Sequence, residues 1–556
     1  MGIPREIKLD GEYYALSPHS ETPYRRYAQS PLVGQDKMRF WSTWPMRTWH
    51  GGERMKRFLN VTDMESGRYH DGEGVFVNEW GELTLQPALT RVVTVQSTTG
   101  PMVVSEDGTK VIVGLSVSPY AKIGTVSGST LSWTDATGLT AGLVDIISTR
   151  SAYYAVTSGG AVMTSANGTA WSAHGAYTGA VGVAHVNSKL YVLKSTEVWD
   201  DAEDEQLSAI GGSYICGFLD NLYWGSNRRM YTYNGNADFE YRQFPDGFNM
   251  TGLLPYRMAI WVPGYYQIQG GYVGVVHYVM PGTENHLYTL GDYSSDHRIY
   301  ALAGGDNEVW FASPKRGGAD RFDLEEGGIS CGPAWAAAGK IPFKGMAYFQ
   351  GFLIVARYDN VAGTDGIYAA NLVNPSTYRS SGWLTSADYD YGHSYNEKVI
   401  RSIRVEHDRL TAGQSIKIEY STDRGSNWTT AGVSNLVGSD GQVFFIGAVH
   451  CTQLKLKITL NAGASATTTP KLRTVATQGA PKLDGTWRWE LALVAFSKTR
   501  GAIDKGNLET SFKKATPLTF VDRSGAPYSV IIEDLEFQEI MVDKDSAIML
   551  ITLSEV

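Results

Sequence analysis

Charged residues of the kinds used in glycoside hydrolysis occur in three places along this sequence. Five carboxylates are concentrated in Asp200–Glu205, two arginines stand side by side at 228–229, and the run Asp320–Asp323 contains two aspartates and an arginine. Cleavage of a glycosidic bond needs two carboxylates across a sugar, or a tyrosine nucleophile with a carboxylate. The chain therefore contains the residue types that this reaction needs. Whether these side chains lie close together depends on how the strands are arranged in the fold.

The acidic run has a simpler explanation as a solvated loop, because adjacent carboxylates repel one another and are best accommodated in water. The sequence lacks G-x-x-x-x-G-K-[ST], G-x-S-x-G, H-E-x-x-H and C-x-x-C, and its eleven histidines have no ligand-like spacing. Neither Asp200–Glu205 nor Asp359–Asp365 follows the spacing of a calcium loop. We therefore predict a protein that is not an enzyme, with no catalytic residue, cofactor or metal site.

The amino-acid composition indicates an all-β protein with several domains. The 556 residues include 61 glycines, 32 tyrosines and 15 tryptophans, and only 19% are charged. This balance favours short strands and tight turns over helices. A chain of this length exceeds what one hydrophobic core usually serves, and we expect four domains.

Charge and apolar patterning restrict the partners and the location of the protein. The net charge is -9 and no window holds eighteen consecutive apolar residues, so we expect neither nucleic-acid binding nor membrane insertion. The first six residues lack the apolar core of a signal peptide, which favours synthesis in a cytoplasm. The three widely separated cysteines, Cys216, Cys331 and Cys451, predict reduced, buried thiols.

Residues 91–375 repeat a loose unit of an apolar strand, a glycine- or asparagine-containing turn and a second strand rich in tyrosine and tryptophan. Copies begin at Ala152–Val156, Lys189–Leu193, Asn221–Gly225 and Ala347–Val355. Spacings of about 35–50 residues are typical of propeller blades, which bury their faces by closing into a ring. We predict a β-propeller of five to seven blades, and the irregular spacing in the second half leaves a pair of sandwiches as the alternative.

Two short runs resemble the Asp-box, the S-x-D-x-G-x-x-W hairpin turn of sialidase-like propellers. Ser421–Trp428 fits this pattern in full, whereas in Ser165–Trp171 Asn167 replaces the aspartate and the glycine and tryptophan come one position early. The acidic or amide side chain of such a box accepts backbone N–H bonds within the turn. We therefore expect both runs to be fold devices without catalytic roles.

Residues 376–480 have the period-two pattern of a β-sandwich. Ile416–Tyr420 alternates apolar and polar residues, and Asp423 and Gly425 supply turn chemistry before the chain extends again at Trp428. Leu454–Leu460 repeats the alternation. The sequence therefore predicts a hairpin followed by further strands of one small sandwich.

Residues 481–556 predict a last β-domain, with extended runs at Trp487–Val494, Leu518–Gly525, Tyr528–Leu535 and Ile548–Val556. With the YSTDRGSNW, LKLKITL and TTTPKL segments before them, these runs resemble the sandwich modules and C-terminal β-domains of bacteriophage distal tail and minor tail proteins. The resemblance covers roughly residues 380–556 and implies that the last domain docks to the tail. Distal tail proteins normally begin with that domain, so the broader family of minor tail proteins fits better.

Residues 1–90 are expected to form an extended arm rich in tryptophan and tyrosine. Three tryptophans fall within nine residues of this arm, and aromatic residues carry much of the energy at protein interfaces. The stretch Arg57–Leu89 resembles lead-in segments that thread into a propeller in phage proteins. The alternative role of these tryptophans is packing inside the chain. The predicted assembly interface consists of Trp41, Trp44, Trp49, Trp487, Trp489 and Leu553.

The resemblance implies a structural component of a phage tail, near the tail tip or baseplate, that contributes to tail assembly and to host-surface binding. Its expected partners are other phage tail proteins, further copies in a threefold or sixfold ring, and a host glycan or protein. A ring would convert weak contacts of the propeller into avidity. A propeller glycosidase and a glycan-binding adhesin without catalysis stay open as alternatives.

Overall fold

A computed structural model gives the fold of the chain, which clusters into two compact units. Unit 1 comprises residues 1–40, 392–399 and 480–556, and unit 2 comprises residues 41–391 and 400–479. The structure describes residues 6–9, 12–16, 24–26, 42–46, 49, 52–53, 57–58, 68–78, 81–94, 100–269, 271–280, 286–288, 298–313, 318–324, 329–335, 343–357, 365–391, 397–463, 466–481, 486–495, 507–510, 512, 517–521, 527–538 and 547–555.

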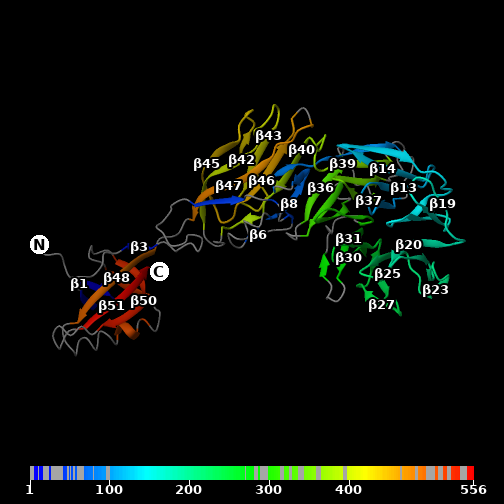
Figure 1. The fold of residues 1–556 in the computed structure, drawn as a ribbon. Coiled ribbons are helices and arrows are strands. Elements are labelled where there is room, and N and C mark those ends of the chain that lie inside the picture. Colours follow the sequence, from blue (N-terminus) through cyan, green and yellow to red (C-terminus); the bar gives the residue numbers. More distant parts are fainter. Residues whose placement is uncertain are drawn as a thin grey trace. The chain divides into compact units, whose positions relative to one another are not determined.

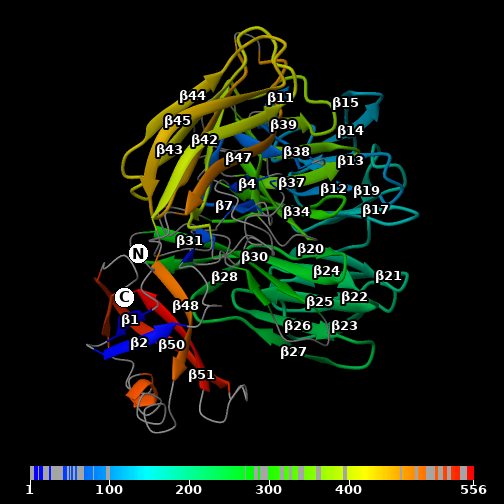
Figure 2. The same cartoon turned by 90° about the vertical axis from the view of Figure 1, so that its left-hand side faces the viewer.

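The larger part of unit 2 is a β-propeller (Figures 1 and 2). Four of its blades are four-stranded antiparallel sheets whose strands follow one another in sequence, because short turns join neighbouring strands. Their strands are, in blade A, β12 (Met102–Val104), β13 (Val111–Gly114), β14 (Ala121–Ser127) and β15 (Thr130–Asp135); in blade B, β16 (Leu143–Ser148), β17 (Tyr153–Thr157), β18 (Val162–Ser165) and β19 (Ser172–Ala173); in blade C, β20 (Ala180–Val186), β21 (Lys189–Lys194), β22 (Val198–Asp200) and β23 (Glu205–Ser208); and in blade D, β24 (Tyr214–Phe218), β25 (Asn221–Ser226), β26 (Arg229–Tyr233) and β27 (Asp238–Gln243).

Of the three further blades, blade F also has four consecutive antiparallel strands, whereas blades E and G depart from this plan. In blade E two short strands share one edge of a long strand, and in blade G the fourth strand comes from a segment that precedes blade A. Their strands are, in blade E, β28 (Phe248–Met250), β29 (Leu254–Tyr256), β30 (Ala259–Ile268), β31 (Gly271–Val279) and β32 (His286–Tyr288); in blade F, β33 (Leu302–Gly304), β34 (Glu308–Ser313), β35 (Gly318–Asp323) and β36 (Ile329–Trp335); and in blade G, β37 (Phe343–Phe349), β38 (Phe352–Arg357), β39 (Gly366–Asn371) and β11 (Ala88–Thr94).

The blades close into a ring. The inner strands β12, β16, β20, β24, β29, β33 and β37 each contact the next, and β37 contacts β12. Within the described residues, seven hydrophobic clusters fill the seven spaces between neighbouring blades. Burying one blade face against the next leaves few exposed edges, which is the physical reason for closure. The prediction of five to seven blades is therefore confirmed at seven.

The rest of unit 2 is a β-sandwich (Figure 1). The Ser421–Trp428 turn joins β43 to β44 as the predicted hairpin. One sheet contains β45 (Gly441–Cys451), β42 (Lys398–His407), β47 (Leu472–Pro481), β10 (Leu83–Leu85) and β9 (Val75–Val77), with β4 (Ser42–Met46) also beside β47; the other contains β44 (Thr429–Ser434), β43 (Ser415–Ser421), β46 (Lys455–Asn461), β40 (Ser381–Thr385) and β8 (Asp71–Glu73).

Unit 1 is a small closed barrel formed by strands from both ends of the sequence, coloured blue and orange to red in Figure 1. The order is β2-β1-β49-β50-β51-β48, and β48 pairs again with β2, so the described sheet has no open edge between them. Leu9, Leu493, Phe520, Val530 and Leu553 belong to its core. Its strands are β1 (Glu6–Leu9), β2 (Glu12–Leu16), β48 (Thr486–Ala495), β49 (Leu518–Val521), β50 (Pro527–Gln538) and β51 (Ala547–Glu555), with β3 (Tyr24–Arg26) added beside β48.

The predicted domain boundaries need correction in the first 90 residues. The described strands of this segment are extended, as expected of an arm, but they are shared among three domains instead of forming one. Strands β1 to β3 complete the barrel, β4 and β8 to β10 complete the sandwich, and β11 completes blade G. Three short strands, β5 (Gly52–Glu53), β6 (Arg57–Phe58) and β7 (Arg68–Tyr69), pair with β36, with β41 (Asp388–Tyr389) and with β5, respectively.

Candidate ligand pocket

A cavity of about 540 Å³ lies in unit 2 where blades F and G meet the sandwich. Blade F contributes Asp306 and Asn307 from the turn between β33 and β34, and blade G contributes Tyr348 from β37. Tyr378 and Lys471 come from the sandwich side. The volume falls within the range of about 300–1,000 Å³ typical of small-molecule sites.

Arg321 on β35 forms the inner wall of this pocket and attaches the sandwich to the propeller. Its Nη1 lies 3.4 Å from Glu308 Oε2, and its Nη2 donates a 2.5 Å hydrogen bond to the carbonyl oxygen of Val77. The guanidinium also lies 4.9 Å from the centre of the Phe76 ring. Burial raises the pKa of Glu308, and the neighbouring arginine opposes that rise. Arg321 is thus a buried anchor, because its contacts join β35 to β34 and to β9.

The turn between β33 and β34 forms the rim of the pocket and is held from two sides. From blade E, the Tyr256 hydroxyl donates to the carbonyl of Gly305 and the Arg257 guanidinium donates to the carbonyl of Asp306. From blade G, the Tyr348 hydroxyl donates to Asp306 Oδ2 at 2.7 Å. Burial, followed by this bond to a carboxylate, raises the pKa of Tyr348 above its usual value. The tyrosine therefore stays a protonated donor at neutral pH.

The acidic run Asp200–Glu205 is only partly the solvated loop that the sequence suggests. Asp200 is 4% exposed and its Oδ2 lies 3.0 Å from the Lys189 ammonium. Asp201 accepts a 2.6 Å hydrogen bond from the Tyr177 hydroxyl and lies 3.0 Å from His174 Nε2. The first two carboxylates thus fasten this hairpin to its surroundings, and the remaining three are exposed.

Both arginines at 228–229 form ion pairs with neighbouring acidic residues. Arg228 is in an ion pair with Asp246, and Arg229 Nη1 lies 3.6 Å from Glu240 Oε2. Arg228 lines a second cavity of about 530 Å³ together with His277. His277 is 3% exposed among aromatic rings, and burial lowers its pKa to about 4. This histidine is therefore neutral in the folded protein.

Both predicted Asp-boxes are turns held by their own side chains. Asp423 Oδ1 accepts bonds from Ser421 Oγ at 2.6 Å and from Asn427 N at 2.9 Å, and these bonds lower its pKa to about 2. Asn167 Oδ1 accepts from Thr169 N at 2.9 Å in the degenerate copy. A third such turn surrounds Asp107, whose pKa is also lowered to about 2 by its bonds to Ser105 and Thr109. The sequence reasoning missed this copy, although its Ser-x-Asp-Gly run carries the signal.

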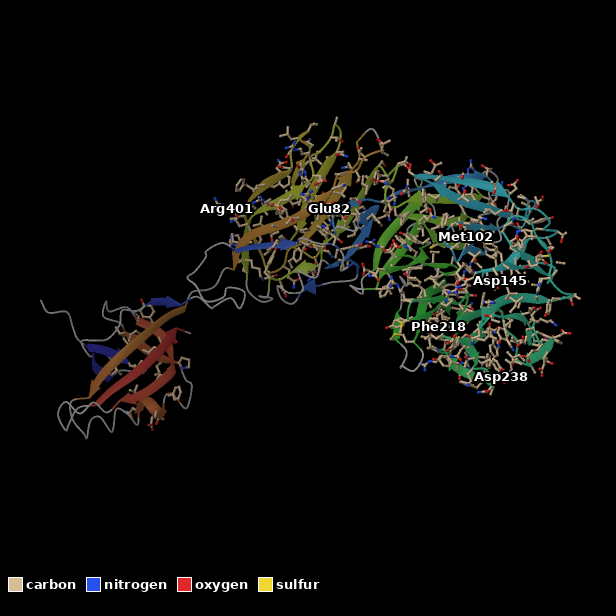
Figure 3. All side chains as sticks on the ribbon, in the orientation of Figure 1. Glu82, Met102, Asp145, Phe218, Asp238 and Arg401 are labelled. Carbon is tan, nitrogen blue, oxygen red and sulfur yellow. The ribbon has the colours of Figure 1, made fainter. Side chains whose placement is uncertain are left out.

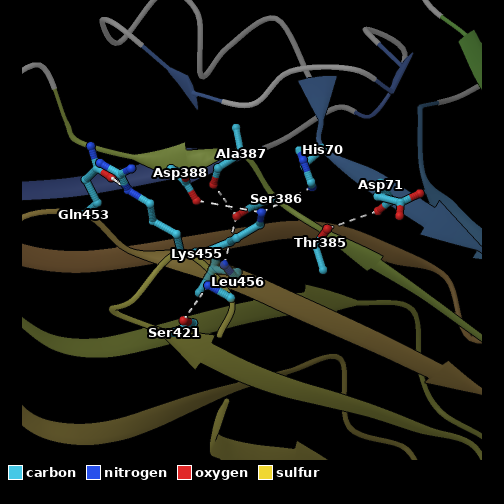
Figure 4. Close-up of polar contacts among 12 residues, drawn as sticks. His70, Asp71, Thr385, Ser386, Ala387, Asp388, Ser421, Gln453, Lys455 and Leu456 are labelled. Carbon is cyan, nitrogen blue, oxygen red and sulfur yellow. Dashed lines mark hydrogen bonds and ion pairs between the residues drawn. The ribbon is translucent and has the colours of Figure 1, made fainter. Parts of the chain in front are cut away.

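A polar cluster in the sandwich lies next to the Ser421–Trp428 turn, because the Lys455 side chain is close to Gly425 (Figure 4). Lys455 Nζ lies 3.2 Å from His70 Nδ1 and 3.8 Å from Asp388 Oδ1. The Ser386 hydroxyl accepts the Leu456 N–H at 2.9 Å and donates to the Ala387 carbonyl at 2.7 Å. The bonds of Ser386 satisfy polar groups between strands and give the cluster a structural role. Among the described residues, the buried Asp388 Oδ1 has the Lys455 ammonium nearby but no hydrogen-bond partner.

The predicted interface residues are placed in part. Trp49 and Leu553 are both buried with 0% exposure, which matches the alternative of packing inside the chain. Trp44 lies on β4 opposite Thr477, Trp487 lies opposite Arg25, and Trp489 lies opposite Leu553 in the barrel sheet. The side chains of these three tryptophans, and the whole of Trp41, lie outside the described residues.

Other sequence expectations concern thiols, metals and membranes. Cys216 and Cys451 are buried free thiols, as predicted, and the Cys331 side chain lies outside the described part. Among the residues that the structure describes, no three His, Cys, Asp or Glu side chains gather to hold a metal ion. The same part of the chain contains no helix that is long and apolar enough to span a membrane.

Comparison with known proteins finds no matching family model and no matching curated protein. Among solved structures, YCF48 from Cyanidioschyzon merolae matches 51% of this chain and 98% of its own, with a TM-score of 0.36 and 11% identity. The WD40 β-propeller domain of Doa1 matches 51% of this chain and 96% of its own, with a TM-score of 0.37 and 9% identity. The N-terminal domain of Nup159 matches 51% of this chain and 94% of its own, with a TM-score of 0.35 and 9% identity. Similarity at this level does not assign a family.

Proposed function

We propose that the protein is a structural component of a phage tail, a minor tail protein in which the barrel is the assembly module and the propeller is the binding module. The observation that carries this proposal is the barrel of unit 1, which combines strands from both ends of the chain into a separate compact unit. A module with its own core can engage a neighbour without disturbing the propeller. The resemblance of residues 380–556 to tail proteins supports the same assignment.

An apolar surface on the sandwich supports assembly as well. Five large hydrophobic side chains are exposed on β44, β45 and the loop that joins them, and Phe445 is 74% exposed. Exposed apolar residues concentrated on neighbouring elements mark interaction sites more often than single ones do. They fit contact with neighbouring tail proteins in a ring. The residues are Val433, Leu436, Val437, Val443 and Phe445.

A test starts from particles purified from the source of this sequence. Quantitative mass spectrometry should find the chain in tail-bearing particles, at three or six copies per tail. Leu9→Asp should place a charge in the barrel core, where Leu9 is 2% exposed, and abolish incorporation while the propeller stays folded. Asp306→Asn changes an exposed propeller residue and should incorporate normally. Particles that lack the wild-type chain would refute the proposal.

A glycan-binding adhesin without catalysis is the second candidate, because the pocket between blades F and G and the sandwich has the size and the mixed aromatic and polar lining of a small-molecule site. It is compatible with the first candidate, since a tail protein that displays a propeller can also bind a host surface.

A further inference from the structure

The charges of the pocket disfavour anionic ligands. Three carboxylates, Asp306, Glu308 and Asp323, line it together with two cations, Arg321 and Lys471. Arg321 is 7% exposed and is already engaged with Glu308, the Val77 carbonyl and the Phe76 ring. A ligand with a carboxylate or sulfate would therefore face more negative than positive charge.

The polar groups of the rim suit a ligand rich in hydroxyls. An ionised carboxylate only accepts hydrogen bonds, a side-chain amide both donates and accepts, and an ammonium only donates. Asp306, Asn307 and Lys471 supply all three kinds on the pocket wall. Adjacent hydroxyls of a sugar ring can donate to the carboxylate and accept from the ammonium at once, whereas an apolar ligand would leave these groups unpaired.

The rim is preorganised for such contacts. Tyr256 and Arg257 hold the backbone of the β33–β34 turn, and Tyr348 fixes the Asp306 carboxylate from the opposite side. A turn that is fixed before binding loses little conformational freedom when the ligand arrives. The rings of Tyr348 and Tyr378 add apolar surface against which the carbon face of a sugar can pack.

We propose that this pocket binds a neutral oligosaccharide built from hexose or N-acetylhexosamine units, without cleaving it. Asp306 and Asn307 contact its hydroxyls, Tyr348 orients the Asp306 carboxylate, and Lys471 donates from the sandwich side. This inference deepens the host-binding part of the proposed function and rests on it for its biological meaning, but the binding itself is a property of the isolated chain.

The first test exposes the purified full-length chain to a printed panel of neutral hexose and N-acetylhexosamine oligosaccharides beside a panel of sialylated and sulfated ones. Binding within the neutral panel is expected. Binding restricted to the anionic panel, or to neither panel, would overturn the proposal. Mass spectrometry of the bound probe should show it intact, and cleavage would overturn the non-catalytic part.

The second test titrates the strongest neutral probe against variants of the pocket. Asp306→Asn and Tyr348→Phe should each weaken binding tenfold or more, with thermal unfolding unchanged. Tyr177→Phe is the matched control, because it removes the same kind of tyrosine-to-aspartate bond, to Asp201 instead of Asp306. Pocket variants that bind like the wild type, or a control that loses as much affinity, would contradict the assignment. Incorporation of Asp306→Asn into particles separates failure of this proposal from failure of the tail assignment.

Discussion

At the scale of single residues, Asp145 joins two blades through its carboxylate. Its Oδ1 accepts the Ile146 N–H and its Oδ2 accepts the Val183 N–H of the next blade, both at 2.9 Å (Figure 3 labels Asp145). Asp145 lies on β16, the inner strand of blade B, and burial raises its pKa to about 6, against the two hydrogen bonds that lower it. The Asp145 carboxylate therefore changes its charge in a pH range in which stability can be measured in solution.

Asp145→Asn should alter how stability depends on pH. Because the folded pKa lies above the usual value of 3.8, the folded state binds more protons than the unfolded state between about pH 4 and 6. The contribution of Asp145 to stability is therefore largest below this window and is lost as the pH rises through it. Between pH 4 and pH 6, the melting temperature of the wild type should fall relative to that of the variant, and from pH 6 to pH 7 the difference should stay constant. A difference that is constant below pH 6 as well would contradict the raised pKa.

The contribution of His277 to stability should depend on pH in the opposite direction. Its folded pKa of about 4 lies below the usual 6.5, so the unfolded state binds more protons between these values and stability falls as the pH decreases through them. His277→Phe removes this titration and places an apolar ring beside Phe244 and Phe248. As the pH decreases from 6.5 to 4, the melting temperature of the variant should rise relative to that of the wild type. An equal decline of both proteins would refute the assignment of a neutral buried histidine.

At the scale of elements, β11 closes the ring by joining blade G from the other end of the propeller. Leu89 on this strand is 4% exposed and packs in the cluster between blades F and G. Leu89→Ala should lower the free energy of unfolding of the propeller by about 2–5 kcal/mol, the usual cost of truncating a buried leucine.

Leu131→Ala is the matched control for β11. Leu131 lies on β15, the outer strand of blade A, and is only partly buried. Thermal or urea unfolding should show a smaller loss for this variant, because β15 is joined to its own blade by a short turn and closes nothing. Equal losses for the two leucines would argue that β11 is an ordinary outer strand.

Strand pairing between neighbours in the sequence was predictable, whereas pairing between distant segments was not. Local alternation and turn residues were enough to predict the propeller, because most blades fold from consecutive strands such as β17 and β18. They could not predict that β1 pairs with β49 or that β11 pairs with β39, since nothing local in the sequence specifies a partner hundreds of residues away. The irregular second half of the repeat has a physical cause in blade E, where β28 and β29 divide one edge of the long strand β30.

The candidate pocket was predictable only in fragments for the same reason. Arg321 and Asp323 stood out as charged residues near one another, but Asp306 and Tyr348 come from separate blades and meet only in the closed ring. No charge run or motif marks the turn at Asp306. The acidic run Asp200–Glu205 was more conspicuous, yet its first two carboxylates are engaged in holding a hairpin.

At the scale of the whole molecule, the chain divides into two compact units. Unit 1 closes on its own core with both ends of the chain, and unit 2 carries the propeller, the sandwich and the pocket. In the proposed tail protein, attachment would depend on the barrel and the sandwich surface around Phe445, whereas host binding would depend on the pocket. Variants of the barrel core should therefore leave binding at the pocket intact, and variants of the pocket should leave attachment intact.

Electron cryomicroscopy of intact particles from the source of this sequence would show whether the chain is built into a phage tail. We expect a threefold or sixfold ring of copies near the tail tip, with the barrel of each copy in contact with other tail proteins and the pocket open to solvent. Particles whose tails contain no density that fits the propeller and the barrel would show that the protein is not a tail component.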